Sequence, residues 1–337
     1  MLYPNFLIEN NTIGVPTPSG GSEDELRKNK YKKAKEFFEE AGYNIILSKN
    51  IYKNYRERSA NKKIRGKEIN DMFKDKNIDI ILCASGGEFL IEALPYINFD
   101  LIKENPKLVA GFSDPTGILF PLTTKYDIAT IYGYNFGTFG IERLDKSHYD
   151  FLSLLKGENY SFKSYPLYQE EQKEKVTGLE PFNLTEKVEW KTLDGKDIEV
   201  EGRIVGGCFD IISELVGTKY DGMKEFNEKY KEDGIIWFFD NCELSMEETI
   251  RTLWKFNEFD YFKYCKAVIF GRFGYPSSNC EYTVKTCLED SILKDLNIPV
   301  IYDADISHKP ETIPILIGSI AKVSCKNKKG TIRFKLK

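Results

Sequence analysis

The chain has 337 residues, of which 41% are hydrophobic and 30% are charged. This composition is ordinary for a soluble globular protein, and the length suggests about two domains. The formal net charge is -4, with 48 basic and 52 acidic residues mixed along the chain. Nucleic-acid binding is therefore not expected, because proteins with that function usually carry a basic stripe or a strong positive charge.

The sequence predicts a cytoplasmic protein. Its first residues lack the basic segment and apolar core of a secretory signal, and no stretch approaches the roughly 18 apolar residues of a membrane helix. The seven cysteines form no CxxC pair and no disulfide-like framework. Only two histidines are present, His148 and His308, so a structural zinc site is not expected and a histidine base must be one of these two.

Strand-like and helix-like segments alternate through the first half of the chain. A capping box of Ser22 and Glu25 predicts a helix that runs to about Ala41 and stops before Gly42, and a second helix is expected over residues 62–76. Strands are predicted over residues 11–15, 43–48, 78–84, 108–112 and 128–133. This alternation predicts a Rossmann-like domain over residues 1–155, with a mostly parallel sheet covered by helices.

The second half is expected to form a separate, β-rich α/β domain over residues 201–337. Residues 156–200 are polar, show no clean period and are interpreted as a connector. Ser245 and Glu248 form a further capping box at the start of a helix. Strand-like runs cover residues 202–207, 234–240, 267–273, 299–306, 315–325 and 331–337.

The stretch "GFSDPTG" places Ser113 between a predicted strand and a predicted helix. At a tight strand-to-helix turn, a serine hydroxyl is exposed and the next backbone N–H can face a developing oxyanion. The stretch departs from the G-x-S-x-G motif because Pro115 replaces the last glycine. The alternative is a helix cap formed by Ser113 or Asp114, since proline suits the first helical turn.

Three other loops follow predicted strands. They carry residues that could take part in catalysis or glycines that let the backbone come close to a ligand. Gly86 and Gly87 in "SGGE" could offer N–H groups to an oxyanion or form a simple turn. Asp240 and Glu243 lie in "FFDNCEL", which could equally be a turn. His308 could be a loop histidine, whereas the charged flanks of His148 suggest a solvated position. No phosphate loop and no G-x-G-x-x-G motif is present.

Four ordered segments together resemble one family. They are "GGEFLIEALPYINFDLIKENPKLVAGFSDPTGIL", "EGRIVGG", "IIWFFDNCEL" and "IPVIYDADISHKPETIPILIG", and the similarity extends from about Thr12 to Ser319. They resemble the LD-carboxypeptidase family of serine peptidases, which includes muramoyltetrapeptide carboxypeptidases and microcin C self-immunity peptidases. The resemblance implies a Rossmann-like N-terminal domain, a β-rich, barrel-like C-terminal domain and a homodimer.

The resemblance also implies a Ser-Glu-His triad shared between the domains. Ser113 matches the nucleophile and His308 matches the base. The glutamate position falls on Asp240, a departure that shortens the acid by one methylene, and Glu243 is the alternative. The implied oxyanion hole uses the backbone N–H groups of Gly87 and Asp114, with Gly86 close to the substrate. The implied mechanism needs no metal or cofactor.

Two substrates remain open within this resemblance. The first is the L–D bond to the terminal D-alanine of a murein tetrapeptide, cleaved in wall recycling. The second is the amide bond of a peptidyl- or aminoacyl-nucleotide. Ser85 stands where many LD-carboxypeptidases have arginine, and Trp190 lies near a base-stacking tryptophan of the immunity enzymes, which points toward the second. The first remains the primary prediction, because it is the broader activity of the family. Trp190 could also be a packing residue, and Arg272 could bind a substrate carboxylate or form a salt bridge.

A third hypothesis belongs to another class of function. The aspartate at position 240 could mark a binding protein that has this fold and has lost hydrolysis. Labelling of Ser113 by an active-serine reagent in a manner that requires His308 would distinguish an enzyme from such a protein.

Overall fold

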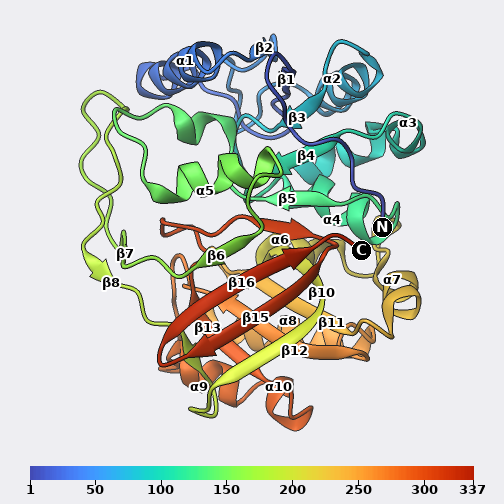
Figure 1. The fold of residues 1–337 in the computed structure, drawn as a ribbon, viewed down its shortest axis with the longest axis vertical. Helices are drawn as coiled ribbons and strands as arrows, with labels where there is room; N and C mark the ends of the chain where they lie inside the picture. Colours follow the sequence, from blue (N-terminus) through green and yellow to red (C-terminus); the bar gives the residue numbers. More distant parts are fainter.

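A parallel sheet forms the core of the N-terminal half in the computed structural model, which describes residues 1–337 (Figure 1). Its strand order is β14-β5-β4-β3-β1-β2, and β1 to β5 run parallel. The strands are β1 (Thr12–Val15), β2 (Asn44–Leu47), β3 (Ile80–Leu82), β4 (Leu108–Gly111), β5 (Thr130–Tyr132) and β14 (Ile315–Ile317). The short runs β3, β4 and β5 are entirely buried, as expected for parallel strands covered on both faces.

Helices surround this sheet and follow the expected alternation. They are α1 (Glu25–Glu40), α2 (Lys62–Lys74), α3 (Phe99–Glu104), α4 (Thr116–Thr124) and α5 (Lys146–Leu155), with 3-10 turns η1 (Leu90–Glu92), η2 (Leu94–Tyr96) and η3 (Phe136–Phe139). The predicted cap of α1 is wrong by two residues. Asp24 caps the helix by accepting the Arg27 N–H at 2.8 Å, whereas the Ser22 hydroxyl donates to the Asp24 carboxylate.

The C-terminal half forms a mixed eight-stranded sheet, which lies below the first sheet in Figure 1. Its order is β6-β16-β15-β10-β11-β12-β13-β9, and β10 to β13 run parallel. The strands are β6 (Ser161–Lys163), β9 (Lys191–Thr192), β10 (Ile198–Cys208), β11 (Ile235–Asp240), β12 (Cys265–Gly271), β13 (Val300–Ala304), β15 (Ile320–Lys326) and β16 (Lys329–Lys335). The fold class is thus confirmed as a Rossmann-like sheet domain plus a β-rich α/β domain.

The helices of the second half are short except for α8. They are α6 (Phe209–Leu215), α7 (Met223–Tyr230), α8 (Met246–Glu258), α9 (Val284–Glu289) and α10 (Ile292–Asp295). The capping box at the start of α8 is confirmed, because the Ser245 and Glu248 side chains each accept the other residue's backbone N–H. No helix is long and apolar enough to cross a membrane.

The two halves exchange chain segments. The run of residues 315–325, predicted as one strand, is divided at Gly318, whose φ is 88°. Its first part, β14, pairs with β5 in the N-terminal sheet, and its second part, β15, pairs with β10 in the other sheet. The connector of residues 156–200 contributes β6 and β9 to the C-terminal sheet and forms the hairpin of β7 (Leu167–Tyr168) and β8 (Glu186–Lys187).

Candidate active site

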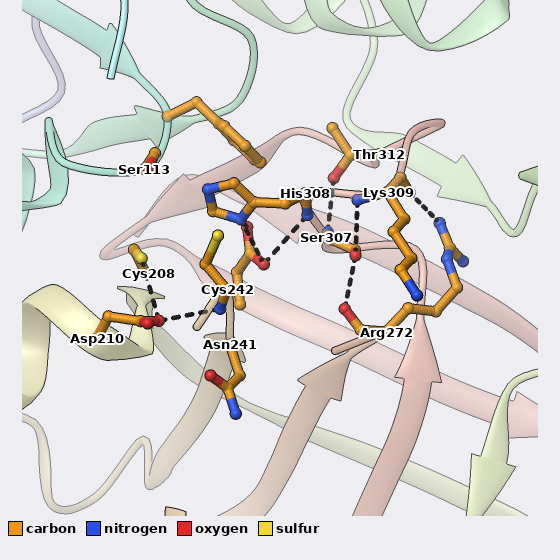
Figure 2. Close-up of polar contacts among 12 residues, drawn as sticks. Ser113, Cys208, Asp210, Asn241, Cys242, Arg272, Ser307, His308, Lys309 and Thr312 are labelled. Carbon is orange, nitrogen blue, oxygen red and sulfur yellow. Dashed lines mark hydrogen bonds and ion pairs between the residues drawn. The ribbon is translucent and has the colours of Figure 1, made fainter. Parts of the chain in front are cut away.

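Four strands from the two sheets end at one place. Strand β3 leads to Gly86 and Gly87, β4 leads to Ser113, β11 ends at Asp240, and β13 leads to His308. Ligand sites in parallel sheets lie at such carboxyl ends. Figure 2 shows Ser113 and His308 on facing segments, with the free ring nitrogen of His308 turned to the side on which Ser113 lies.

Ser113 occupies a strained turn and does not cap a helix. Its φ is 68°, in the left-handed region that few residues with a side chain adopt. Helix α4 begins at Thr116 with Pro115 at the cap position, and no side chain makes a capping hydrogen bond. The helix-cap interpretation of Ser113 and Asp114 is therefore wrong. A strained backbone of this kind is typical of a functional residue that the surrounding structure holds in place.

The two glycines of "SGGE" let the backbone approach Ser113 closely. A Cβ added to Gly86 would lie 2.9 Å from the Cβ of Ser113, and one added to Gly87 would lie 2.5 Å from the Ser19 hydroxyl oxygen. The backbone N–H groups of Gly87 and Asp114 donate to no protein group. These two N–H groups are therefore available to a ligand oxygen.

The Asp114 side chain holds the Ser113 turn against the neighbouring loops. Its carboxylate accepts hydrogen bonds from the Ser19 hydroxyl and, at 3.0 Å, from the Leu90 N–H. Burial raises the pKa of the Asp114 carboxyl to about 6, against the lowering effect of these two hydrogen bonds. The side chain thus connects the Ser113 turn to the loops that carry Gly87 and Ser19.

Asp240, which is fully buried, pairs with His308, which is partly exposed. The His308 Nδ1 lies 3.0 Å from an oxygen of Asp240, and the His308 backbone N–H donates to the same carboxylate at 3.3 Å. Burial would lower the pKa of His308, but the negative charge and hydrogen bond of Asp240 outweigh it and raise that pKa well above its usual value. The His308 Nε2 has no hydrogen-bond partner, and no hydrogen bond joins it to Ser113.

Tyr132 connects the acid to the serine turn, a role that the sequence analysis did not predict. The Tyr132 hydroxyl donates to Asp240 at 2.7 Å and accepts the Ser113 N–H at 3.4 Å. Tyr132 is the last residue of β5, next to β4. Its hydroxyl reaches Asp240 only because the two sheets meet here, which no local pattern in the sequence encodes.

Arg272 holds the His308 loop and is not free to bind a substrate carboxylate. Its guanidinium is buried, forms an ion pair with Asp305, and donates to the carbonyls of Lys309 and Glu311 at 2.9 and 2.8 Å. The Ser307 hydroxyl donates to the Arg272 carbonyl at 2.6 Å, a contact drawn in Figure 2. Of the two alternatives for Arg272, the structure therefore supports the salt bridge, which here is buried and holds the loop that presents His308.

Two other residues lie apart from the roles considered for them. Trp190 is 0% exposed, and its Nε1–H donates to Asp305 at 2.9 Å, so its ring offers no face to a nucleotide base. Glu243 is exposed. Burial raises the pKa of Glu88, and the negative charge of Glu243 raises that pKa further. Asp240, and not Glu243, is therefore the acid that contacts His308.

His148 was expected to be solvated, and this expectation is wrong. The side chain is fully buried, its Nδ1 accepts the Asp145 N–H at 3.1 Å, and its ring lies 4.7 Å from that of Tyr134. Burial lowers the pKa of His148 to about 4. It is a neutral packing residue of α5, which leaves His308 as the histidine that can act as a base.

A serine beside free N–H donors, with a histidine oriented by a carboxylate across from it, is the arrangement of a serine hydrolase. Two family models match the chain, the LD-carboxypeptidase N-terminal domain over residues 13–133 and the LD-carboxypeptidase C-terminal domain over residues 201–323. The protein belongs to the LD-carboxypeptidase family of serine peptidases.

Relatives in this family carry two kinds of name. A protein of Vibrio cholerae named as a putative carboxypeptidase is 25% identical, covering 99% of this chain and 96% of its own. The microcin C7 self-immunity protein MccF of Escherichia coli is 26% identical, covering 90% of this chain and 87% of its own. A protein of Bacillus subtilis named as a probable murein peptide carboxypeptidase is 27% identical over 65% of this chain and 60% of its own.

Solved structures confirm the fold. MccF in complex with aspartyl sulfamoyl adenosine superposes with a TM-score of 0.83 at 23% identity, with both chains covered completely. An MccF-like protein of Streptococcus pneumoniae in complex with AMP gives a TM-score of 0.80 at 24% identity, covering 97% of this chain and 99% of its own.

Proposed function

We propose that the protein is an active serine peptidase of carboxypeptidase type, with Ser113 as nucleophile, His308 as general base and Asp240 as the acid that orients the base. The observation that carries this proposal is the strained Ser113 turn, with two free N–H donors on one side and the His308–Asp240 pair across from it. Asp240 replaces the usual glutamate, yet it still reaches His308 at 3.0 Å. The shorter acid is therefore no reason to expect loss of activity.

The proposed reaction follows from this geometry. The Ser113 hydroxyl attacks an amide carbonyl while His308 Nε2 takes its proton. The N–H groups of Gly87 and Asp114 donate to the oxyanion, each worth about 3 kcal/mol of transition-state stabilisation. His308 returns the proton to the leaving amine, and water then releases the acyl group from Ser113 in the same way. The chemistry requires no cofactor.

The first substrate candidate is a murein tetrapeptide, from which the enzyme would remove the terminal D-alanine across an L–D bond. Carboxypeptidase names among the relatives support this candidate. The second candidate is the amide bond of an aminoacyl- or peptidyl-nucleotide. The 26% identity to MccF over 90% of the chain supports it. The burial of Trp190 removes the one residue expected to stack on a base.

The cellular location, the oligomeric state and the partners of the protein are part of the same proposal. Hydrolysis of murein peptides would place the protein in the cytoplasm and in wall recycling, and the family resemblance suggests that it works as a homodimer. Its partners would be small peptides or peptidyl-nucleotides.

The test compares wild type with Ser113→Ala on two substrates. We expect wild type to release D-alanine from a muramoyl tetrapeptide and Ser113→Ala to release none while remaining folded. Release of the amino acid from an aspartyl-nucleotide amide, in place of D-alanine, would favour the second candidate. Failure of wild type on both, together with no labelling of Ser113 by an active-serine reagent, would leave a non-catalytic binding protein and refute the proposed activity.

A further inference from the structure

A cavity extends from the His308 loop into the N-terminal half. One part is lined by His308, Phe112 and Ser307 together with residues of the connector. The next part is lined by Ser85 and Gly86, beside Ser113. The two parts share four lining residues, namely Lys30, Thr138, Lys175 and Gly178. The two parts therefore adjoin each other, one at His308 and the other beside the Ser113 turn.

Lysines without partners line this space. Lys30, Lys173 and Lys175 make no ion pair and donate no side-chain hydrogen bond to another protein group. The nearby Glu180 accepts the N–H groups of Val176 and Thr177 at 2.9 and 2.7 Å through one of its two carboxylate oxygens. Those backbone hydrogen bonds lower the pKa of Glu180 to about 2, and its negative charge acts on Lys30 without a direct ion pair.

Lys30 and Lys175 also act on each other. Burial lowers the pKa of Lys30 and the positive charge of Lys175 lowers it further, while the negative charge of Glu180 acts in the opposite direction. Lys30 is partly buried and Lys175 is exposed, and their two positive charges repel each other. A bound anion would relieve this repulsion and would gain two charge-assisted hydrogen bonds.

Both lysines are held in position by the backbone around them. Helix α1 carries Lys30, and Gly140 approaches it so closely that an added Cβ would lie 1.9 Å from the Lys30 carbonyl oxygen. The connector carries Lys175 and lies beside α1, as Figure 1 shows. The Asn29 amide donates to the Thr177 carbonyl at 3.2 Å, and the Glu142 N–H donates to the Leu179 carbonyl at 2.7 Å.

We infer that Lys30 and Lys175 form an anion-binding subsite that recognises the negatively charged end of the substrate, a carboxylate or a phosphate. This inference rests on the proposed function for the identity of the bond cleaved, but not for the binding of the anion. The subsite would place a charged group in the cavity beside Gly86 while the neighbouring amide carbonyl lies at Ser113. It would make the enzyme selective for substrates that end in an anion.

The experiment measures binding and turnover separately. Binding of a muramoyl tetrapeptide, of its C-terminal amide and of AMP is measured by calorimetry with Ser113→Ala protein, so that no probe is consumed. Lys30→Gln and Lys175→Gln are each added to this background. We expect either change to weaken the binding of one anionic probe by about tenfold or more, as for the loss of one charge-assisted hydrogen bond. In the active enzyme, the same changes should raise KM and leave kcat unchanged.

Lys33→Gln is the matched control. Lys33 also lies on α1 but is 41% exposed and faces Glu36 on the surface, so its substitution should change neither affinity nor KM. A loss confined to the tetrapeptide identifies a carboxylate, and a loss confined to AMP identifies a phosphate; either supports the subsite. Equal affinity for the tetrapeptide and its amide, with AMP binding unchanged by both lysine substitutions, overturns it. Lysine-dependent binding without hydrolysis by wild type would retain the subsite and refute only the proposed activity.

Discussion

The substitution Asp240→Asn tests the assignment of the acid most directly. Asp240 is 0% exposed and accepts three hydrogen bonds: from the Tyr132 hydroxyl at 2.7 Å, from His308 Nδ1 at 3.0 Å and from the His308 N–H at 3.3 Å. Asparagine has the same size, but one of its two terminal atoms is a donor in place of an acceptor. The shape of the site is therefore preserved while its charge and hydrogen-bond pattern change.

Each orientation of the new amide disrupts the site. If its NH₂ group faces His308, Nδ1 must accept, so the ring proton moves to Nε2 and the base can no longer take the Ser113 proton. If the NH₂ group faces Tyr132, the buried hydroxyl loses its acceptor and the imidazolium loses its counter-charge. The wrong tautomer in a comparable triad lowers kcat by about 10⁴, which corresponds to about 5 kcal/mol. The buried unpaired donor should lower the free energy of unfolding by about 1–3 kcal/mol.

The assay is kcat/KM for the wild-type substrate, with Ser113→Ala defining the background and thermal unfolding reporting stability. We expect the kcat/KM of Asp240→Asn to be about 10²-fold to 10⁴-fold lower than that of wild type. Activity within tenfold of wild type, in protein shown to be folded, would refute the role of Asp240 as the group that orients His308. Glu243→Gln is the matched control, because this exposed carboxylate does not contact the histidine and its loss should leave kcat unchanged.

Four further predictions follow from the same geometry. Asp240→Glu restores the residue usual in the family but adds a methylene to a fully buried site, so we expect lower activity and a loss of about 1–3 kcal/mol in unfolding free energy; an equal or faster enzyme would contradict this. Because Asp240 raises the pKa of His308 and the base must be neutral, kcat/KM should rise with pH through that raised value, and a profile that falls there would contradict the assignment. The charged pair stabilises the fold fully below the unfolded histidine pKa of about 6.5, and this contribution should be lost as pH rises through the folded value. Ser113→Gly should be inactive yet at least as stable as Ser113→Ala when both are compared by denaturant unfolding, since glycine adopts a φ of 68° without strain; a less stable glycine variant would argue against stored strain.

The sequence predicted the parts of the site that depend on strand ends. Ser113, Asp240 and His308 each lie at the end of an apolar run or just after it. The three runs belong to two sheets, and their carboxyl ends meet at the site. The capping box at Ser245 could also be predicted, because it involves residues that are neighbours along the chain. The start of α1 was misassigned because two residues could cap it, and Asp24 holds the position by accepting the Arg27 N–H.

Roles that depend on contacts between distant segments could not be predicted in this way. The flanking charges of His148 suggested exposure, although His148, Phe151 and Leu155 share one face of α5 and are all buried. For Trp190, base stacking and packing are both open on the sequence, and the contact that decides for packing is distant: a Cβ added to Gly330 would lie 2.1 Å from the Trp190 ring. For Tyr132 and Arg272, the decisive partners Asp240 and Asp305 are far away in sequence.

The strand β14 explains how residues from two sheets keep one geometry. After His308 the chain runs directly into β14, where Ile315 pairs with Tyr132 of β5 in the opposite sheet. Tyr132 in turn contacts both Asp240 and the Ser113 N–H. A movement of one sheet against the other would therefore have to break the β14–β5 pairing or carry the His308 loop along with the Ser113 turn. Because the base is tied through β14 to the sheet that carries the nucleophile, the distance between them is set by backbone pairing and not by the packing of the two halves alone.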